Sequence, residues 1–209
     1  MAPFSARLEA FIGRRLVKKR GRDAKLLTRA NAALKNMSPT LAVSSPLGPS
    51  ESPLLPEHTP LADNRFPTLS WTLPSDVDPA QVHSYLLVVE DPDAPLPSPV
   101  VHGLYYGLPA EKTSVGPDDF VPVNGGQGDD LAGGFRYGAN RMKSVWGGPR
   151  PVLAHGPHRY FFQVIALKND LSAGGGDKLL SKKQLLKALV DDNVLAWGEW
   201  VGTFERQLE

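Results

Sequence analysis

The sequence predicts a β-rich sandwich with peripheral helices, preceded by a helical extension at the N-terminus. Several short segments after residue 67 have the apolar patterns of strands. Helical periodicity is confined to the two ends of the chain, and no internal repeat divides it. A chain of 209 residues with 41% hydrophobic and 22% charged residues fits one domain with an extension.

The composition excludes several classes of protein. The chain has no cysteine, so a disulfide scaffold, a thiolate nucleophile and a Cys-ligated zinc are impossible. The longest apolar stretches are too short to span a bilayer, and the first residues lack the apolar core of a secretory signal. We therefore predict a cytoplasmic protein, with a mitochondrial location as the alternative, and we expect no cofactor and no metal.

The positive charge is concentrated at the N-terminus. Residues 1–37 hold ten Lys or Arg against two carboxylates, a net +8, whereas the body, residues 38–209, carries −7. This asymmetry predicts either an anionic partner for the basic extension or pairing of the extension with its own acidic body, and we favour pairing. Nucleic acid is not expected as a partner, because no basic stripe continues into the body.

The basic extension has the pattern of two helices. Apolar residues recur at helical spacing over Phe4–Leu16, with Arg and Lys opposite. Gly21 breaks the pattern, and a second helix is predicted over Asp23–Leu34, with Asp23 as its cap. We expect a helical hairpin packed on the body. A membrane-surface helix and a mitochondrial presequence are the alternatives, since the segment is amphipathic and rich in arginine.

Short strands follow a proline-rich loop. Six prolines between residues 44 and 67 forbid helix and central strand there. The predicted strands are Thr68–Leu73, Ser84–Glu90, Val101–Leu108, His158–Leu167 and Glu199–Glu205. Both faces of His158–Leu167 are largely apolar, so this strand is expected at the centre of a sheet covered on both sides.

Two further segments complete the expected order of elements. A Gly-rich loop runs from about Asn124 to Gly148, before the central strand. Ser181 and Gln184 form a capping-box pair that opens a helix through about Asp191.

Candidate chemistry lies at the ends of the predicted strands. A buried strand leads directly into Asp91 and Asp93, and the prolines beside them fix the backbone that aims their carboxylates. His102 opens the returning strand and His158 opens the central one, and a nearby carboxylate would hold such histidines in one tautomer. A surface turn with solvated acids, and two hydrogen-bonded core histidines, are the structural alternatives.

Three blocks of residues carry a family resemblance. They are Leu86–Pro95 followed by His102, then Trp146–Pro151, then Gly156–Tyr160. Their order and spacing resemble the phosphatidylethanolamine-binding protein family, which includes the Raf kinase inhibitor proteins, plant flowering-time regulators and bacterial homologues. The resemblance extends from about Pro39 to the C-terminus, and the N-terminal helices resemble an extension of fungal-type members.

The resemblance implies a sandwich of two sheets with a small anion-binding pocket at one edge. The ligand-binding candidates are Asp91, Asp93, His102, Gly147, Gly148, His158 and Tyr160. Free backbone N–H groups at the glycine turn, an imidazolium and a phenol together can hold a phosphate or carboxylate. Asp91 is expected to orient a histidine. Arg159 points to the opposite face by strand alternation, where it is expected to pair with a carboxylate such as Asp93.

The sequence departs from the family pattern beside His102. Gly103 stands where the family usually has an aromatic residue, and Val100 and Val101 stand where polar or aromatic residues are common. The loss of an aromatic wall predicts a larger or more apolar pocket, and therefore a bulkier ligand than phosphoethanolamine.

Two functional hypotheses remain open from the sequence. The first is a binding protein for a small anionic or phospholipid-headgroup ligand, or a bulkier apolar molecule, with a protein partner that it regulates. The rival is a biosynthetic enzyme in which Asp91, His102 and His158 move protons to isomerise, dehydrate or cyclise an apolar small molecule. A hydrolase is not supported, because the sequence has no Ser–His pair and no Gly-x-Ser-x-Gly elbow. Contact of residues 1–37 with a membrane surface is a third expectation.

Overall fold

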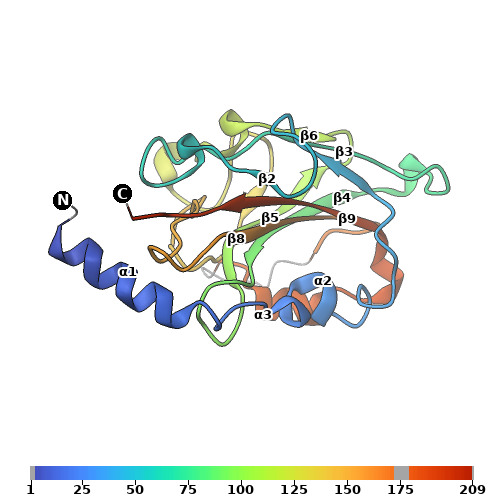
Figure 1. The fold of residues 1–209 in the computed structure, drawn as a ribbon. Helices are drawn as coiled ribbons and strands as arrows, with labels where there is room; N and C mark the ends of the chain where they lie inside the picture. Colours follow the sequence, from blue (N-terminus) through green and yellow to red (C-terminus); the bar gives the residue numbers. More distant parts are fainter. Residues whose placement is uncertain (1–2, 172–178, 209) are drawn as a thin grey trace.

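Two sheets face each other in the computed structural model, which describes residues 3–171 and 179–208 (Figure 1). The larger sheet has the strand order β2-β9-β8-β4-β5-β7 and the smaller one β1-β3-β6. The strands are β1 (Ala42–Ser44), β2 (Ser52–Pro53), β3 (Leu69–Thr72), β4 (Ser84–Asp91), β5 (Val100–Pro109), β6 (Ser114–Val115), β7 (Arg136–Tyr137), β8 (His158–Leu167) and β9 (Val194–Phe204). The predicted class, mostly β with peripheral helices, is confirmed.

The strand β8 lies at the centre of the larger sheet, between β4 and β9. On one face Tyr160 and Phe162 belong to the core between the two sheets. On the other face Ile165 and Leu167 belong to a second core beneath the helices. Its two apolar faces are therefore both covered, as its sequence predicts.

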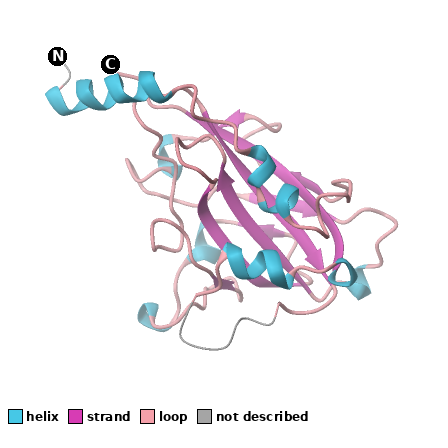
Figure 2. Cartoon of the chain, turned by 90° about the horizontal axis from the view of Figure 1, so that it is seen from below, coloured by secondary structure: helices cyan, strands magenta, loops and turns pink. Residues whose placement is uncertain are grey.

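Helices cover the outer face of the larger sheet (Figures 1 and 2). They are α1 (Phe4–Leu16), α2 (Leu27–Ala30) and α3 (Lys182–Ala188). The α3 helix begins at the predicted capping box of Ser181 and Gln184. The helix α1 extends beyond the end of the sheet, whereas α2 and α3 lie across its strands (Figure 2). No helix within the described ranges is both long and apolar enough to cross a membrane.

The predicted helix over Asp23–Leu34 is wrong. The segment contains a 3₁₀ turn at Asp23–Lys25 and the four residues of α2. Asn31 ends α2, because its side-chain oxygen accepts from the backbone N–H groups of Ala33 (2.9 Å) and Leu34 (3.2 Å). An asparagine that binds nearby backbone groups competes with helix continuation. Asp23 is not a side-chain cap either.

Other element boundaries also differ from the predictions. The strand β9 begins at Val194 rather than Glu199, and α3 ends at Ala188 rather than about Asp191. The short strands β2 and β7 lie inside segments predicted as loops. Each of these two strands pairs with a long neighbour over only two residues. Two residues are too few to show the alternation of apolar and polar side chains by which a strand is recognised in a sequence.

Candidate functional site

Asp91, the last residue of β4, is held by its own turn. Its Oδ1 accepts from the backbone N–H groups of Asp93 (2.7 Å) and Ala94 (3.1 Å). Its Oδ2 accepts from Nδ1 of His158 at 2.7 Å. The two side chains meet because β4 and β8 are antiparallel neighbours with Glu90 opposite Phe161. The Asp-Pro-Asp block therefore fixes a buried carboxylate against the first residue of the central strand.

His155 completes a row of hydrogen bonds that begins at Asp91. Its Nδ1 lies 2.7 Å from Nε2 of His158, and its Nε2 lies 2.9 Å from the carbonyl oxygen of Leu16, in α1. A carbonyl only accepts, so His155 carries its proton on Nε2. Burial lowers the pKa of His155, although the bond to Leu16 acts in the opposite direction. His155 is therefore neutral, and its Nδ1 accepts.

This arrangement determines the charge on His158. Its Nε2 donates to His155 and its Nδ1 donates to Asp91, so the ring carries both protons. His158 is thus an imidazolium paired with the Asp91 carboxylate. Both of its N–H groups are engaged, so it supplies charge to its surroundings but no donor for a ligand. No partner for His155 could be predicted from the sequence, because its role depends on the packing of α1.

His102 differs from His158 in its hydrogen bonds and its charge. The register of β4 and β5 shifts between Val89–Gly103 and Glu90–Val101, which leaves His102 as the extra residue of a β-bulge. Its Nδ1 donates to the carbonyl oxygen of Gly147. Burial lowers the pKa of His102 despite the nearby Asp91 charge, so its ring is neutral and Nε2 is an acceptor. That Nε2 is buried, lies 3.9 Å from Asp91 Oδ2 and has no hydrogen-bond partner among the described residues.

Tyr160 adds an unused hydroxyl beside His102. Its ring stands edge-on to that of His102, with the centroids 5.1 Å apart. Within the described part of the chain, its buried hydroxyl has no hydrogen-bond partner. Burial raises the pKa of Tyr160 well above its usual value, and the charges of Asp91 and Asp93 raise it further. The phenol therefore remains protonated and is available as a donor.

These side chains line one cavity of about 250 Å³. Its wall consists of Asp91, Ala94, Pro95, Leu96, Val100, His102, Arg141, Met142, Arg150, Pro151, Val152, His158 and Tyr160. The three distant blocks of the sequence thus converge, with Asp91, His102, His158 and Tyr160 together, as the family resemblance implied. Arg141 and Arg150 were not predicted. Their position on either side of the Trp146–Pro149 segment was the only signal in the sequence.

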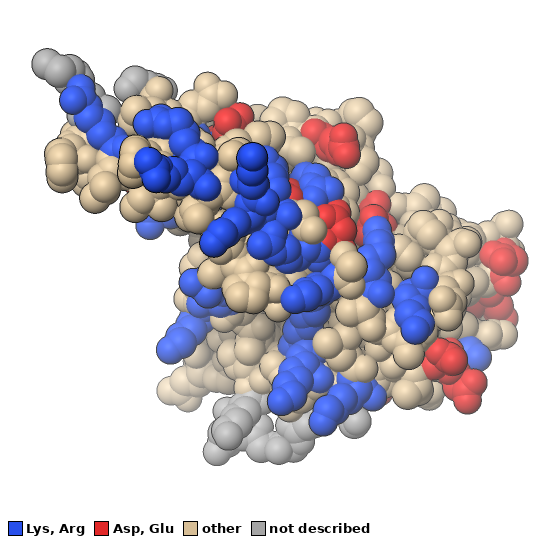
Figure 3. All heavy atoms as spheres, turned by 60° about the horizontal axis from the view of Figure 1, so that its bottom comes forward, with Lys and Arg blue, Asp and Glu red and all other residues tan. Residues whose placement is uncertain are grey.

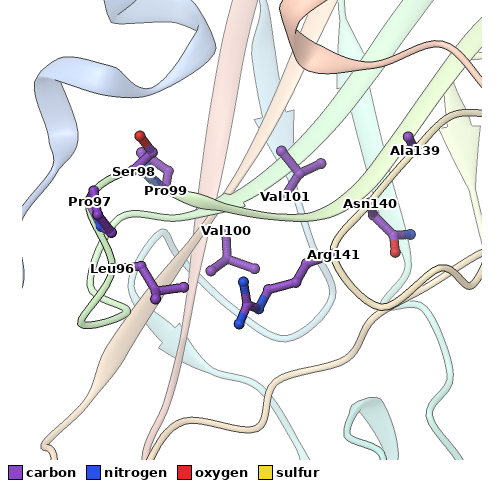
Figure 4. A pocket seen from close by; sticks show the side chains of 9 residues that line it. All are labelled: Leu96, Pro97, Ser98, Pro99, Val100, Val101, Ala139, Asn140 and Arg141. Carbon is purple, nitrogen blue, oxygen red and sulfur yellow. The ribbon is translucent and has the colours of Figure 1, made fainter.

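Backbone hydrogen bonds place Arg141 at the cavity. The strand β7 covers only Tyr105 and Tyr106 of β5. Along the remaining edge, the N–H groups of Gly138, Arg141 and Gly147 donate to the carbonyl oxygens of Leu104 (2.7 Å), Val101 (3.1 Å) and His102 (2.9 Å), respectively. The Gly-rich loop therefore follows this edge. Figure 4 shows Arg141 reaching toward Val100 and Leu96.

Two neighbouring hollows adjoin the cavity. One, of about 450 Å³, shares Leu96, Val100 and Arg141 with it (Figure 4). The other, of about 360 Å³, shares Met142 and Arg150. The cavity therefore shares parts of its wall with two further hollows.

Gly147 and Gly148 do not supply the free N–H groups that were predicted for an anion in the pocket. Gly147 and Gly148 line the adjoining hollow instead of the cavity itself. The N–H of Gly147 donates to His102 at 2.9 Å, and that of Gly148 donates to the side-chain oxygen of Asn64 at 3.1 Å. Neither N–H is free for an anion, because the loop uses both to attach itself to the body.

Asp93 also lies outside the cavity wall. Its carboxylate accepts from Nε (2.8 Å) and an Nη (2.9 Å) of Arg159, which confirms the predicted pair. Arg159 also binds Asp23. Burial alone would raise the pKa of Asp93, but the hydrogen bonds and charge of Arg159 outweigh it and lower the pKa to about 2. We therefore assign Asp93 a structural role. It holds Arg159, which binds Asp23 and so attaches the N-terminal segment to the body.

Gly103 does not widen the cavity. It is absent from the cavity wall, and a Cβ at this position would lie 2.6 Å from the hydroxyl oxygen of Tyr105. The Tyr105 hydroxyl donates to the carbonyl of Val145 at 2.8 Å. The space of a larger residue is thus filled by Tyr105, so Gly103 does not itself make room in the cavity.

No set of three or more metal-binding side chains is assembled in the ranges 3–171 and 179–208. Asp91, His102 and His158 do meet, but the Nδ1 of His102 and both nitrogens of His158 are engaged in hydrogen bonds.

The molecule is thus a two-sheet sandwich with a pocket where β4 ends and where β5 and β8 begin. The family model of phosphatidylethanolamine-binding proteins matches residues 50–205, and the chain belongs to that family. Its fold is also similar to that of YbcL from Escherichia coli, with a TM-score of 0.62, 25% identity and coverage of 79% of this chain and 98% of YbcL.

Two fungal relatives match nearly the whole chain. One, from a fungal species, is 36% identical over 95% of this chain and 94% of its own length. The other, from Talaromyces stipitatus, is 37% identical over 96% of this chain and 82% of its own length. Both are named phomoidride biosynthesis cluster protein B.

Proposed function

We propose that this protein binds a small organic anion with an apolar tail. The observation that carries this proposal is an apolar cavity with two arginines at its wall. Within the described residues neither Arg141 nor Arg150 forms an ion pair, although both line the cavity. A guanidinium binds carboxylate or phosphate in two parallel hydrogen bonds. The Tyr160 hydroxyl adds a third donor.

The remaining wall suits an apolar tail. Leu96, Val100 and Met142 line the same cavity as the arginines, and two hollows adjoin that cavity. Binding sites for small molecules usually combine such apolar walls with a few convergent polar groups. The family supports a binding role, and the names of the fungal relatives support a ligand from a biosynthetic pathway.

Calorimetric titration tests this proposal with three probes of equal chain length: an alkyl phosphate, an alkyl carboxylate and an alkyl alcohol. Both anions are expected to bind, and the alcohol is expected to bind at least tenfold more weakly. Arg150→Gln should weaken anion binding about tenfold, because a charged hydrogen bond contributes about 1.5–3 kcal/mol. Arg136→Gln, on β7, is the matched control. Equal affinity for all three probes, or for wild type and Arg150→Gln, would contradict the proposal.

A second candidate function is proton transfer to and from the bound molecule. The observation that favours it is the neutral Nε2 of His102, an acceptor without a partner in the described structure, beside the protonated Tyr160. A base and an acid on one cavity wall can take a proton from carbon and donate one to oxygen.

Deuterium exchange tests this second function. Alkyl 2-oxo acids in D₂O should exchange hydrogen at the carbon beside the carbonyl, because His102 removes that proton and solvent deuterium replaces it. His102→Gln should abolish the exchange while anion binding persists. Exchange no faster than in protein-free solution would rule out catalysis on this probe and leave the binding proposal intact.

A further inference from the structure

The apolar face of α1 does not pack on the body. The sequence predicts that the stripe from Phe4 to Leu16 faces inward, but Phe4 is 83% exposed and Leu8 is 49% exposed. Phe11 and Ile12 are exposed as well. Leu8, Phe11 and Ile12 lie four, seven and eight positions after Phe4, so the four residues form one continuous surface of the helix. We call Phe4, Leu8, Phe11 and Ile12 the apolar face of α1.

Small residues hold α1 against the body instead. Ala10 and Gly13 are its buried residues. A Cβ at Gly13 would overlap the carbonyl oxygen of Leu153, so the backbones approach closely there. Glu9 accepts from the backbone N–H of Leu153 (3.1 Å) and from Arg206 (2.6 Å). The helix therefore contacts the body with the side that carries its small residues, Ala10 and Gly13. This attachment leaves the apolar face exposed to solvent.

Basic side chains surround the apolar face and remain largely without acidic partners. The sequence favoured pairing of the ten basic residues in 1–37 with the acidic body. Across the described residues, only Arg20 and Arg29 of that set form ion pairs. The exposed cations of α1 and the turn after it are Arg7, Arg14, Arg15, Lys18 and Lys19. Figure 3 shows Lys and Arg gathered over α1 and across the helix-bearing side, where Asp and Glu are few.

We propose that α1 is a membrane-surface anchor that lies flat on a bilayer containing anionic phospholipids. An exposed apolar face bordered by Arg and Lys matches such an interface, in which acyl chains accept the apolar residues and headgroups attract the cations. A second copy of the chain fits less well, because a symmetric contact through α1 would place like charges together.

The anchor also has a defined relation to the cavity. Leu153, which contacts α1, follows Pro151 and Val152 of the cavity wall. The carbonyl of Leu16 accepts from His155, which binds His158. A bilayer bound to α1 would thus hold the loop that forms one side of the cavity.

Vesicle sedimentation with the full chain tests the proposal. Wild type should sediment with vesicles of phosphatidylcholine mixed with phosphatidylserine, and far less with phosphatidylcholine alone or at high salt. The double variant Leu8→Gln/Phe11→Gln should bind at least tenfold more weakly. Arg14→Gln/Arg15→Gln should lose about tenfold or more, since each cation near an anionic surface contributes about 1 kcal/mol.

Matched control variants show whether vesicle binding depends on the apolar face of α1 in particular. Leu55→Gln/Leu61→Gln removes two leucines of similar exposure, 44% and 56%, outside α1 and should leave vesicle binding unchanged. Tyr160→Phe, in the cavity wall, should leave it unchanged too, so loss of cavity binding and loss of membrane binding are distinguishable. Sedimentation independent of phosphatidylserine, or unaffected by Leu8→Gln/Phe11→Gln, would overturn the proposal. A solution dimer that this double variant dissociates would assign the face to a second copy instead.

Discussion

Asp91, His158 and His155 each have a role that is set by the neighbouring group. The carbonyl of Leu16 determines the tautomer of His155, which makes His155 an acceptor for His158. His158 thus keeps both protons beside a carboxylate. His102, in the same cavity, is neutral, and its acceptor nitrogen has no hydrogen-bond partner in the part of the chain that the structure describes. Two histidines that look equivalent in the sequence therefore have different chemistry.

His155→Leu tests the row of hydrogen bonds. The variant removes the acceptor for Nε2–H of His158. The ¹⁵N NMR signal of His158 Nε2 should therefore lose the chemical shift of a hydrogen-bonded N–H that it has in wild type. His83→Leu, at an exposed histidine, is the control. An unchanged ¹⁵N signal of His158 Nε2 in His155→Leu would show that His155 is not its acceptor.

Asp93 should make the protein sensitive to acid. Its pKa is lowered to about 2, so its charged form is favoured by folding. The resulting stability is complete above the ordinary aspartate pKa near 4 and is lost as the pH falls through about 2. A lowering of this size corresponds to roughly 2 kcal/mol. Chemical unfolding should show that the free energy of unfolding depends less on pH in this window for Asp93→Asn than for wild type.

The exposed variant Asp76→Asn serves as the control for this measurement, and its pH dependence should match that of wild type. If Asp93→Asn and wild type had parallel profiles between pH 4 and 2, Arg159 would not be what keeps Asp93 charged.

At the scale of elements, the helix-facing side of the larger sheet determines how α2 is formed. The buried Glu90 accepts from the backbone N–H of Leu27 at 2.6 Å. The side-chain oxygen of Gln163 accepts from the N–H (3.1 Å) and hydroxyl (2.7 Å) of Thr28. Two sheet residues thus satisfy the first N–H groups of α2, which have no partner within the helix. Such distant partners explain why local periodicity predicted the wrong helix.

The attachment of α1 depends on Gly13. Gly13→Val should separate α1 from Leu153, because even a Cβ overlaps that carbonyl. We expect a loss of roughly 1–3 kcal/mol in the attachment of α1, and faster amide hydrogen exchange over residues 4–16. Arg14→Val, one position away and exposed, is the control for the change in helix propensity. Slow exchange retained in Gly13→Val would mean that this close approach is not required.

At the scale of the whole molecule, the cavity joins β4, β5, β8 and the Gly-rich loop, so a bound anion should stabilise the native state as a unit. An alkyl phosphate at a hundred times its Kd should add about 2.7 kcal/mol to the free energy of unfolding. The thermal midpoint should rise accordingly for wild type and for Arg136→Gln. For Arg150→Gln at the same concentration it should rise only about half as much, because tenfold weaker binding leaves about 1.4 kcal/mol of stabilisation. Equal rises in all three would place the anion outside the cavity.

Much of the architecture could be predicted from the sequence. The strand β8 and the start of α3 matched their predictions because burial of two apolar faces and a capping box are local patterns. Asp91, His102, His158 and Tyr160 were placed together by the resemblance. Arg141 and Arg150 were missed, because exposed arginines in a loop have no distinguishing local pattern and depend on where the loop binds β5.

The sequence by itself determined where the longer strands lie, that the chain lacks cysteine chemistry, and that a carboxylate and two histidines occupy strand ends. Only the tertiary structure decided which polar groups remain unused. The N–H groups of Gly147 and Gly148 donate to distant acceptors, whereas His102 Nε2 and the Tyr160 hydroxyl have no partner within residues 3–171 and 179–208. It also decided which face of α1 is exposed. One physical reason explains the unpartnered polar groups and the exposed face of α1. A hydrogen-bonding group or a helix face that contacts one partner is not available to another, and that partner lies far away in the chain.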